Sequence, residues 1–223
     1  MTTVTPFKYP DACKALLETG SVRVPRNESN FMRTYTGKKF WPLDPRVSEI
    51  DVADIAHHLA NECRFNGATR RHYSVAEHAV RVSYLAQHLV LKEARGKAAI
   101  HYARRVALWG LHHDDSEAYL RDLIRPIKNA PGLGSLYRMI ERELMQEVIA
   151  AFALLPHEPS VVKEADTIIS ETEGRDLVKG YQVSPGVETL PYTIVPRSPQ
   201  HAEEDFLTRH CALVNAIAID EAE

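Results

Sequence analysis

The sequence of 223 residues has few cysteines, no long apolar run and little net charge, and each shortage excludes a class of protein. Its three cysteines, Cys13, Cys63 and Cys211, lie far apart and lack the paired spacing of a zinc ribbon or a redox motif. Structural disulfides are therefore not expected. No stretch approaches the roughly 18 apolar residues of a membrane-spanning helix, and the start of the chain lacks the basic and apolar regions of a secretion signal. We expect a cytoplasmic protein that does not bind membranes.

The charge balance also argues against a nucleic-acid-binding protein. The formal net charge is -3 at pH 7, so the chain has no global basic field, and stable nucleic-acid binding is not expected. A small anionic ligand would need only a local basic cluster. With 44% hydrophobic and 26% charged residues the composition is that of an ordinary globular protein, and the length suits one domain spanning 1–223.

Apolar residues recur at helical spacing over most of the chain, which predicts an all-α fold. Ser74 and Glu77 have the spacing of a capping box, in which each side chain satisfies a free backbone N–H at the start of a helix. Helices are expected at about 50–63, 74–91, 97–119, 135–154, 158–179 and 200–219.

Two segments do not fit a helical pattern. Residues 33–45 predict a short β hairpin with Gly37 at its turn, closed by prolines. Residues 181–199 are rich in proline and β-branched residues, which predicts an extended segment before the last helix. The predicted bundle core therefore spans about 50–179.

Four polar residues stand where a bundle helix should be apolar. His78 lies among valines and alanines of one predicted helix, His113 and Asp114 follow the apolar stripe of the next, and Asp166 interrupts a third. Because a buried unpaired imidazole or carboxylate costs several kcal/mol, these side chains should meet, either in a buried hydrogen-bonded network or around a cation. Imidazole and carboxylate ligands together suit manganese, iron, cobalt, nickel or zinc better than calcium.

The motifs around these residues resemble a known family. YSVAEHAVRVS, LHHDDSEAYLRDLIRPIK and VKEADTIISETEGRDL resemble, in order and spacing, the H…HD…D signature of HD-domain phosphohydrolases, which are helical bundles. They are similar in particular to bacterial 5′-deoxynucleotidases and to small phage-encoded dATP triphosphohydrolases. The resemblance covers about 50–179. It implies that one divalent transition metal ion (Mn, Co, Fe, Ni or Zn) is bound by four ligands: His78, His113, Asp114 and Asp166.

The resemblance also implies roles for residues near the metal ligands. Glu117, one turn beyond His113, corresponds to a glutamate that helps to activate the attacking water. Asp122 corresponds to the aspartate of a G-D-L-x-x-P turn, although Arg121 stands where the family commonly has glycine. His112 and Asp115 are offset by one position from the ligands and should point about 100° away, behind the site or on the surface.

A third set of residues is implied to bind the substrate. Arg64 and Phe65 occupy the place of an arginine–aromatic pair that holds the phosphate and packs against the sugar or base, with phenylalanine in place of the usual tryptophan. Lys128, with Arg125 close by, forms a local basic cluster that could neutralise further phosphates.

These features predict a metal-dependent hydrolase of a small-molecule nucleotide. The preferred reaction converts a deoxynucleoside 5′-monophosphate to deoxynucleoside and phosphate. A dNTP triphosphohydrolase of the dATP type is the second candidate, and a non-catalytic module that senses a nucleotide through the same fold is a third. Cyclic-nucleotide and (p)ppGpp hydrolases share the ligand signature but are usually longer. Relatives with this signature tend to form oligomers, so a homo-oligomer is expected.

Overall fold

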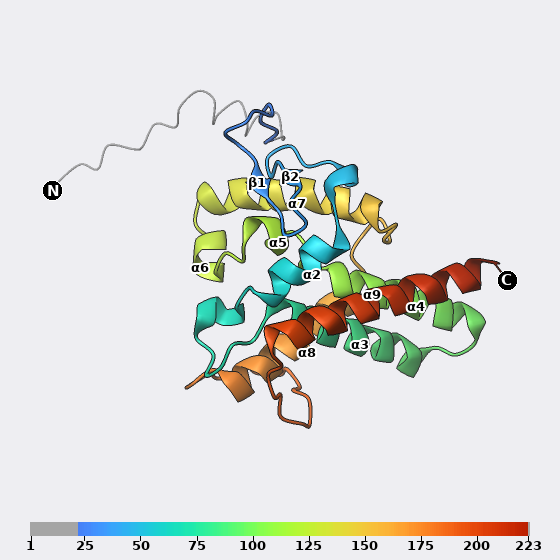
Figure 1. Ribbon diagram of the computed structural model, residues 1–223. Coiled ribbons are helices and arrows are strands. Elements are labelled where there is room, and N and C mark those ends of the chain that lie inside the picture. Colours follow the sequence, from blue (N-terminus) through green and yellow to red (C-terminus); the bar gives the residue numbers. More distant parts are fainter. Residues whose placement is uncertain (1–21, 223) are drawn as a thin grey trace.

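The computed structural model describes residues 22–222, which form a helical bundle with a small hairpin on one side (Figure 1). Cys13 lies outside these residues, and Cys63 and Cys211 are free thiols. In chain order the elements are β1 (Met32–Arg33), β2 (Lys39–Phe40), η1 (Val47–Glu49), α2 (Val52–Ala60), η2 (Arg64–Gly67), α3 (Val75–Glu93), α4 (Lys97–His112), α5 (Glu117–Leu120), α6 (Arg125–Lys128), α7 (Leu133–Ala151), α8 (Ser160–Leu177) and α9 (Pro199–Ala222).

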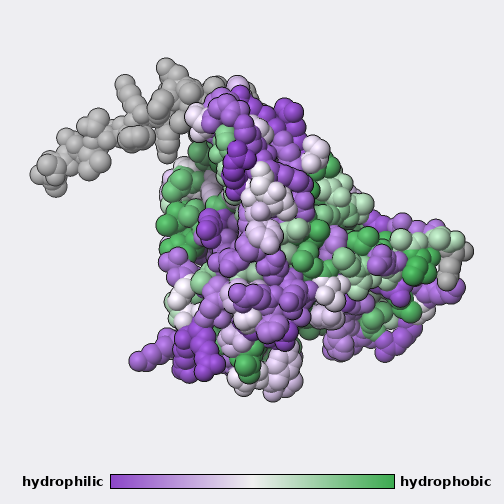
Figure 2. Space-filling view, viewed as in Figure 1, coloured by the Kyte–Doolittle hydropathy of each residue, from purple (hydrophilic) through white to green (hydrophobic). Residues whose placement is uncertain are grey.

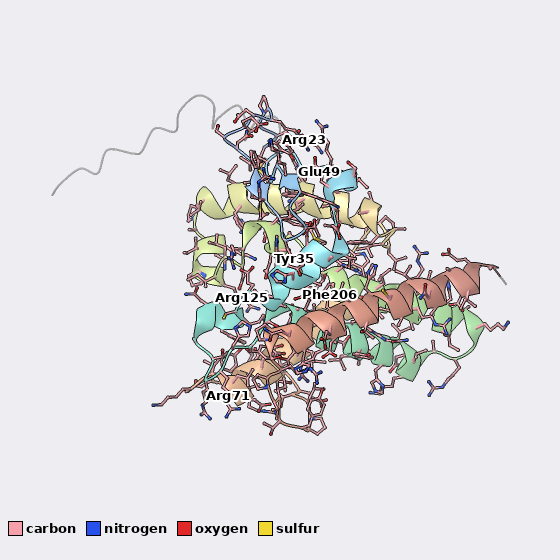
Figure 3. The ribbon with its side chains drawn as sticks, viewed as in Figure 1. Arg23, Tyr35, Glu49, Arg71, Arg125 and Phe206 are labelled. Atoms are coloured by element: carbon pink, nitrogen blue, oxygen red, sulfur yellow. The ribbon has the colours of Figure 1, made fainter. Side chains whose placement is uncertain are left out.

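The long helices pack around α3. This helix lies along α4 and also contacts α8 and α9, while α9 crosses the bundle and reaches α2 and α4 (Figure 1). Phe206 of α9 is fully buried against Ile55 and Leu59 of α2 (Figure 3). The apolar stripes pack into two main buried clusters, one around α2 and the other between α4 and α8, and the all-α prediction with an N-terminal hairpin is confirmed.

One predicted helix is divided. The helix expected over 97–119 ends at His112, and a turn over 113–116 precedes the single-turn helix α5. Aspartate and serine compete with helical hydrogen bonds through their side chains, so the run Asp114, Asp115, Ser116 favours a turn. The backbone N–H of Glu117 donates to the Asp114 carbonyl at 2.9 Å to close it. Because α4 ends at His112, the residues from His113 onward no longer follow the helical spacing of the α4 side chains.

The start of α3 confirms half of the predicted capping box. Ser74 Oγ accepts a hydrogen bond from the Glu77 backbone N–H at 3.1 Å. The prediction that the Glu77 side chain bonds back to the Ser74 backbone N–H was wrong. The Glu77 carboxylate accepts instead from the backbone N–H of Arg197 at 2.8 Å and pairs with Arg81 at 2.6 Å. The N-terminus of α3 is thereby tied to the segment that leads into α9.

The hairpin packs over α2 and α5. Its strands pair antiparallel with Met32 opposite Phe40, and Gly37 supplies the positive φ of the turn. Tyr35 (Figure 3) stacks on His57 of α2 with ring centroids 3.7 Å apart, and Phe40 stacks on Tyr119 at 4.0 Å. Residues 181–198 carry no helix or strand, as expected for the proline-rich segment.

The visible surface is mainly hydrophilic, with small apolar areas at its edges (Figure 2). Within the described residues, no helix combines the length and the apolar character needed to cross a membrane.

Candidate metal centre and active site

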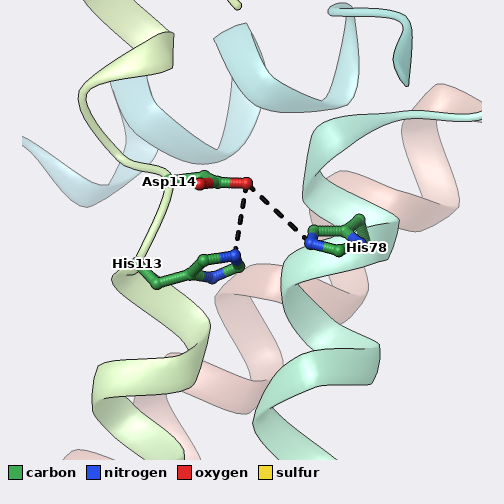
Figure 4. A group of neighbouring side chains, drawn as sticks. All are labelled: His78, His113 and Asp114. Atoms are coloured by element: carbon green, nitrogen blue, oxygen red, sulfur yellow. Dashed lines mark ion pairs between the residues drawn. The ribbon is translucent and has the colours of Figure 1, made fainter. Parts of the chain in front are cut away.

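Three helices bring the four predicted ligands to one place. His78 comes from the first turn of α3, His113 and Asp114 from the turn after α4, and Asp166 from α8. His78 Nε2 lies 3.1 Å from Asp166 Oδ1 and 3.8 Å from Asp114 Oδ2, and His113 Nε2 lies 3.2 Å from Asp114 Oδ2 (Figure 4). One ligand atom each of His78, His113 and Asp114 falls within 4.8 Å of the others, which is compact enough for one metal ion.

The hydrogen bonds behind the two imidazoles fix which nitrogen faces the site. His78 Nδ1 bonds to Glu173 Oε1 at 2.7 Å, and His113 Nδ1 bonds to the Gly110 carbonyl at 2.9 Å. Because both partners are acceptors, each Nδ1 carries a proton, and Nε2 is the nitrogen left to bind either a second proton or a metal ion. Both Nε2 atoms are buried without a well-aligned hydrogen bond to any described residue, although carboxylate oxygens lie close by. Lone pairs and carboxylates that face one another in this way require a cation between them.

The charges at the centre support the same conclusion. Burial alone would lower the pKa of His113, but the charge and hydrogen bond of Asp114, together with Asp166 and the Gly110 carbonyl, raise it to about 10. Burial would raise the pKa of Asp166, but the hydrogen bond and charge of His78 hold it far below the ordinary range. The imidazoles thus take up protons to balance the carboxylates, and a divalent cation that displaces those protons would balance them better. The residues present therefore fit a divalent metal ion.

Glu173 is a buried member of this centre that the sequence analysis did not single out. Its carboxylate is fully buried and accepts from His78 Nδ1 and from the Tyr73 hydroxyl, each at 2.7 Å. Its other oxygen lies 3.3 Å from Arg64 Nη2. A carboxylate behind a ligating histidine fixes the ring and raises its basicity. The signal was present in the sequence, because Glu173 lies two helical turns after Asp166 on the same stripe of α8.

Arg64 contacts the candidate metal centre and also lines the cavity described below. Its guanidinium bonds to Ser170 Oγ at 2.9 Å and lies 3.6 Å from Asp114 Oδ2. Its Nε is buried and has no hydrogen-bond partner among the described residues, so it remains able to donate. Although burial would lower it, the pKa of Arg64 is raised by Glu173 and Asp114, which keeps the group positively charged.

A cavity of about 590 Å³ opens onto this centre. The predicted site residues other than the two histidines all line it. They are Arg64, Phe65, Asp114, Glu117, Asp122, Lys128 and Asp166. Residues that follow α8 complete the wall, among them Tyr181 and Ser184.

Glu117 is buried at the cavity with one unpaired oxygen. Its Oε2 has no hydrogen-bond partner among residues 22–222, and its Oε1 lies 3.5 Å from Lys128 Nζ. Burial, followed by the charges of Asp114 and Asp122, raises its pKa well above the ordinary range. The raised pKa means that this carboxyl group holds a proton more readily than an exposed glutamate does.

Lys128 lies among carboxylates and is not a free cation. Its Nζ lies 3.0 Å from Glu141, 3.5 Å from Glu117 and 3.6 Å from Asp122. These three groups already balance the lysine charge, so its capacity for additional phosphates is smaller than the sequence suggested. Arg125 also lines the cavity, and its side chain is exposed.

The turn that carries Asp122 is strained. Arg121 adopts φ 72° and ψ 152°, a conformation that glycine reaches readily and other residues reach only at a cost. The Asp122 backbone N–H donates to Glu62 Oε1 at 2.8 Å, which holds the turn in place. Arg121 therefore occupies a backbone conformation that glycine adopts readily, at the position where the family resemblance leads one to expect glycine.

Comparison with known proteins agrees with this site. A family model described as 5′-deoxynucleotidase YfbR-like matches residues 63–158, a span that includes His78, His113, Asp114 and Glu117. Uncharacterized protein YfdR of Escherichia coli K12 is 33% identical over 185 residues, covering 81% of this chain and 93% of YfdR. The chain belongs to the YfbR-like family. The family consists of metal-dependent HD-domain phosphohydrolases.

Two further relatives cover different shares of this YfbR-like chain. An uncharacterized protein of Rhodobacter capsulatus is 33% identical over 203 residues, which are 84% of the chain and 97% of that protein. A protein named 5′-deoxynucleotidase from Yersinia pestis (strain Pestoides F) is 34% identical over 86 residues, which are 38% of the chain and 42% of that protein. The named nucleotidase therefore resembles only part of the chain.

In this YfbR-like chain, the residues beside the HD pair face the opposite way. His112 and Asp115 are fully buried, and His112 Nδ1 bonds to Asp115 Oδ2 at 2.6 Å. His112 Nε2 bonds to His210 Nδ1 at 2.9 Å, and its ring stacks on Phe152 with centroids 4.3 Å apart. They lie behind the site in the core, so the surface position allowed by the sequence analysis is wrong.

Proposed function

We propose that the protein hydrolyses deoxynucleoside 5′-monophosphates to deoxynucleosides and inorganic phosphate, with the help of a divalent metal ion. One observation carries the proposal: the unpaired Nε2 atoms of His78 and His113 meet Asp114 at a cavity that also holds Arg64 and Glu117. The cavity volume lies within the roughly 300–1,000 Å³ of small-ligand sites. The name of the partial relative from Yersinia pestis supports the same substrate class.

In the proposed reaction, some side chains bind the metal ion and Glu117 transfers the proton. His78, His113, Asp114 and Asp166 would hold the cation, which supplies Lewis-acid polarisation of a phosphoryl oxygen and lowers the pKa of water. Water must lose a proton as its oxygen attacks phosphorus, and the departing 5′-oxygen must gain one as its bond to phosphorus breaks. In its ionised form Glu117 can accept the first proton at its unpaired Oε2 and then give that proton to the departing 5′-oxygen.

The arrangement of positive charge favours a monophosphate. Arg64 stands beside Asp114 and can donate through its unpaired Nε to a phosphoryl oxygen. A triphosphate would need further cations, and Lys128 is already balanced by three carboxylates. Exposed Arg125 at the cavity is the one observation that favours the second candidate, a dNTP triphosphohydrolase.

The test is a release assay with chelator-stripped protein. Ribo- and deoxynucleoside mono-, di- and triphosphates are incubated with manganese, cobalt, zinc or magnesium, and phosphate and triphosphate are measured separately. Phosphate release from deoxynucleoside monophosphates supports the proposal, whereas triphosphate release identifies the second candidate. Asp114→Ala and Glu117→Gln serve as inactive controls. If no metal restores turnover on any nucleotide, or if Asp114→Ala matches the parent, a non-catalytic nucleotide sensor becomes the better account.

A further inference from the structure

The side chain of Tyr181 lies in the cavity wall and packs against α8 at Gly174. The residue lies just beyond the end of α8, and its ring rests over Gly174 of that helix. A Cβ atom at Gly174 would approach the Tyr181 ring to 2.4 Å, so any larger residue at 174 would displace the ring. The missing side chain at Gly174 therefore lets the aromatic ring reach the cavity.

Phe65 faces Tyr181 within the same cavity. The two ring centroids lie 6.2 Å apart with an interplanar angle of 82°. Phe65 and the following Asn66 both have positive φ values, 53° and 50°, which side-chain-bearing residues adopt at a cost. Phe65 also directly follows Arg64, the cation nearest the metal centre. The strained turn thus presents an aromatic face beside the group that would bind the phosphate.

A second set of contacts holds the segment that carries Tyr181. The Glu171 carboxylate of α8 accepts from the Ser184 backbone N–H at 2.9 Å and from Ser184 Oγ at 2.6 Å. Glu171, Ser184 and Val187 line the cavity together with Tyr181. Fixed in this way, Tyr181 can serve as a preformed contact surface, because little ordering remains to be done when a ligand binds.

We propose an aromatic clamp in which the nucleobase stacks on the Tyr181 ring while Phe65, set at 82° to that ring, closes one side of the base site, and that Tyr181 makes the site select nucleotides over phosphate esters that lack a base. The inference rests on the proposed function and extends it to the half of the substrate that does not react. Stacking against a flat ring accepts every base, because each base has a π face. We therefore expect discrimination between base and no base, with little preference among bases.

The experiment compares two substrates in three variants. Tyr181→Leu keeps bulk over Gly174 but removes the aromatic face, Tyr181→Phe keeps the face, and Tyr192→Ala is the matched control. Tyr192 belongs to the same segment but is half exposed and lines a separate hollow with Arg81 and His88. The substrates are dAMP and 2-deoxyribose 5-phosphate, which carries the same sugar phosphate without a base.

For Tyr181→Leu we expect the KM for dAMP to rise about 10-fold with kcat nearly unchanged, as one lost stacking contact predicts. Both constants for 2-deoxyribose 5-phosphate should remain those of the parent, and Tyr181→Phe and Tyr192→Ala should behave as the parent on both substrates. An equal loss on both substrates would show a structural role, and no loss on either would show that the ring does not contact the base. Either result overturns the clamp.

The outcome for the clamp is separable from the outcome for catalysis. If the parent hydrolyses no nucleotide, the proposed function fails, and the clamp is then tested by equilibrium binding of dAMP and 2-deoxyribose 5-phosphate to the same variants. Tighter binding of dAMP that Tyr181→Leu abolishes would support the clamp without catalysis. Equal affinity for the two compounds in the parent would reject it. Melting temperatures of the variants identify any loss of folding.

Discussion

Two histidine–aspartate pairs lie side by side in the sequence and face opposite regions of the molecule. His113 and Asp114 meet at the cavity, whereas His112 and Asp115 lie in the core beside His210. In the core pair both imidazole nitrogens of His112 have partners, while in the cavity pair His113 Nε2 has no well-aligned partner among the described residues. Residue type therefore does not distinguish a candidate metal ligand from a core residue here. The unpaired nitrogen does.

The two aspartates provide the sharpest test of this comparison, because Asp114→Ala and Asp115→Ala make the same chemical change one residue apart. Asp114→Ala should reduce turnover by more than about 100-fold, beyond the 10–100-fold typical of a group behind a ligand, and should lose metal through gel filtration. Asp115→Ala should not change metal content but should lose about 3 kcal/mol of unfolding free energy, because His112 Nδ1 loses its buried partner while Nε2 keeps its bond to His210. Urea unfolding and metal analysis separate the two effects, and metal loss in both variants would contradict the comparison.

A substitution at Glu173 tests whether the carboxylate that bonds to His78 Nδ1 contributes to metal affinity. In Glu173→Gln the His78 Nδ1 proton keeps an acceptor but loses the negative charge that raises the basicity of the ring. Metal affinity should fall by about 10- to 100-fold, while the variant remains folded. Competition with a metallochromic chelator measures the affinity. An unchanged dissociation constant would mean that Glu173 only fills space.

Relief of the backbone strain at Arg121, beside the cavity, should stabilise the protein by less than Asp115→Ala destabilises it. Arg121→Gly should raise the free energy of unfolding by about 1 kcal/mol, because glycine adopts the observed φ and ψ without strain. The lost contact of the exposed Arg121 side chain with Glu62, at 3.7 Å, contributes little. Turnover should change little. A less stable variant in urea unfolding would show that this turn is not strained.

The buried imidazole of His210, which bonds to His112 in the core, should make the stability of the protein depend on pH. Burial, followed by the neighbouring His112, lowers the pKa of His210 to about 4 from the ordinary 6.5. Between these values the unfolded chain binds a proton that the folded protein does not, so stability falls as the pH decreases from about 6.5 to 4. Urea midpoints at pH 7 and pH 5 should therefore differ more in the parent than in His210→Asn. Equal differences would exclude His210 as a cause.

Much of this architecture could be predicted because it depends on local pattern. Helical spacing of apolar residues located the six long helices, and the polar interruptions at His78, His113, Asp114 and Asp166 indicated inward-facing groups that the structure does bring together. The helix over 97–119 was predicted too long because spacing alone does not register the turn-forming run after His112. Whether the four residues bind metal stays a prediction that the proposed assays address.

The remaining features depend on contacts between distant segments. Tyr181 reaches the cavity only because α8 has a glycine at 174, and no pattern around either residue indicates that the two touch. Lys128 is balanced by Glu141 of α7, which a local reading of the basic cluster cannot include. His112 is satisfied by His210, which lies 98 positions later in the chain. Such contacts form only when the whole chain packs together, so no short stretch of the sequence predicts them.

The bond from Arg197 to Glu77 has a consequence for the order in which the protein is made. Synthesis proceeds from the N-terminus, so α3, α4 and α8 leave the ribosome before residue 197 and the helix α9 that follows it. Until then the first turn of α3, where His78 lies, lacks both its tie to Arg197 and the packing of α9. A nascent chain that still lacks α9 therefore holds the candidate ligand helices without these contacts, and competence for metal should arrive only after α9 has been made.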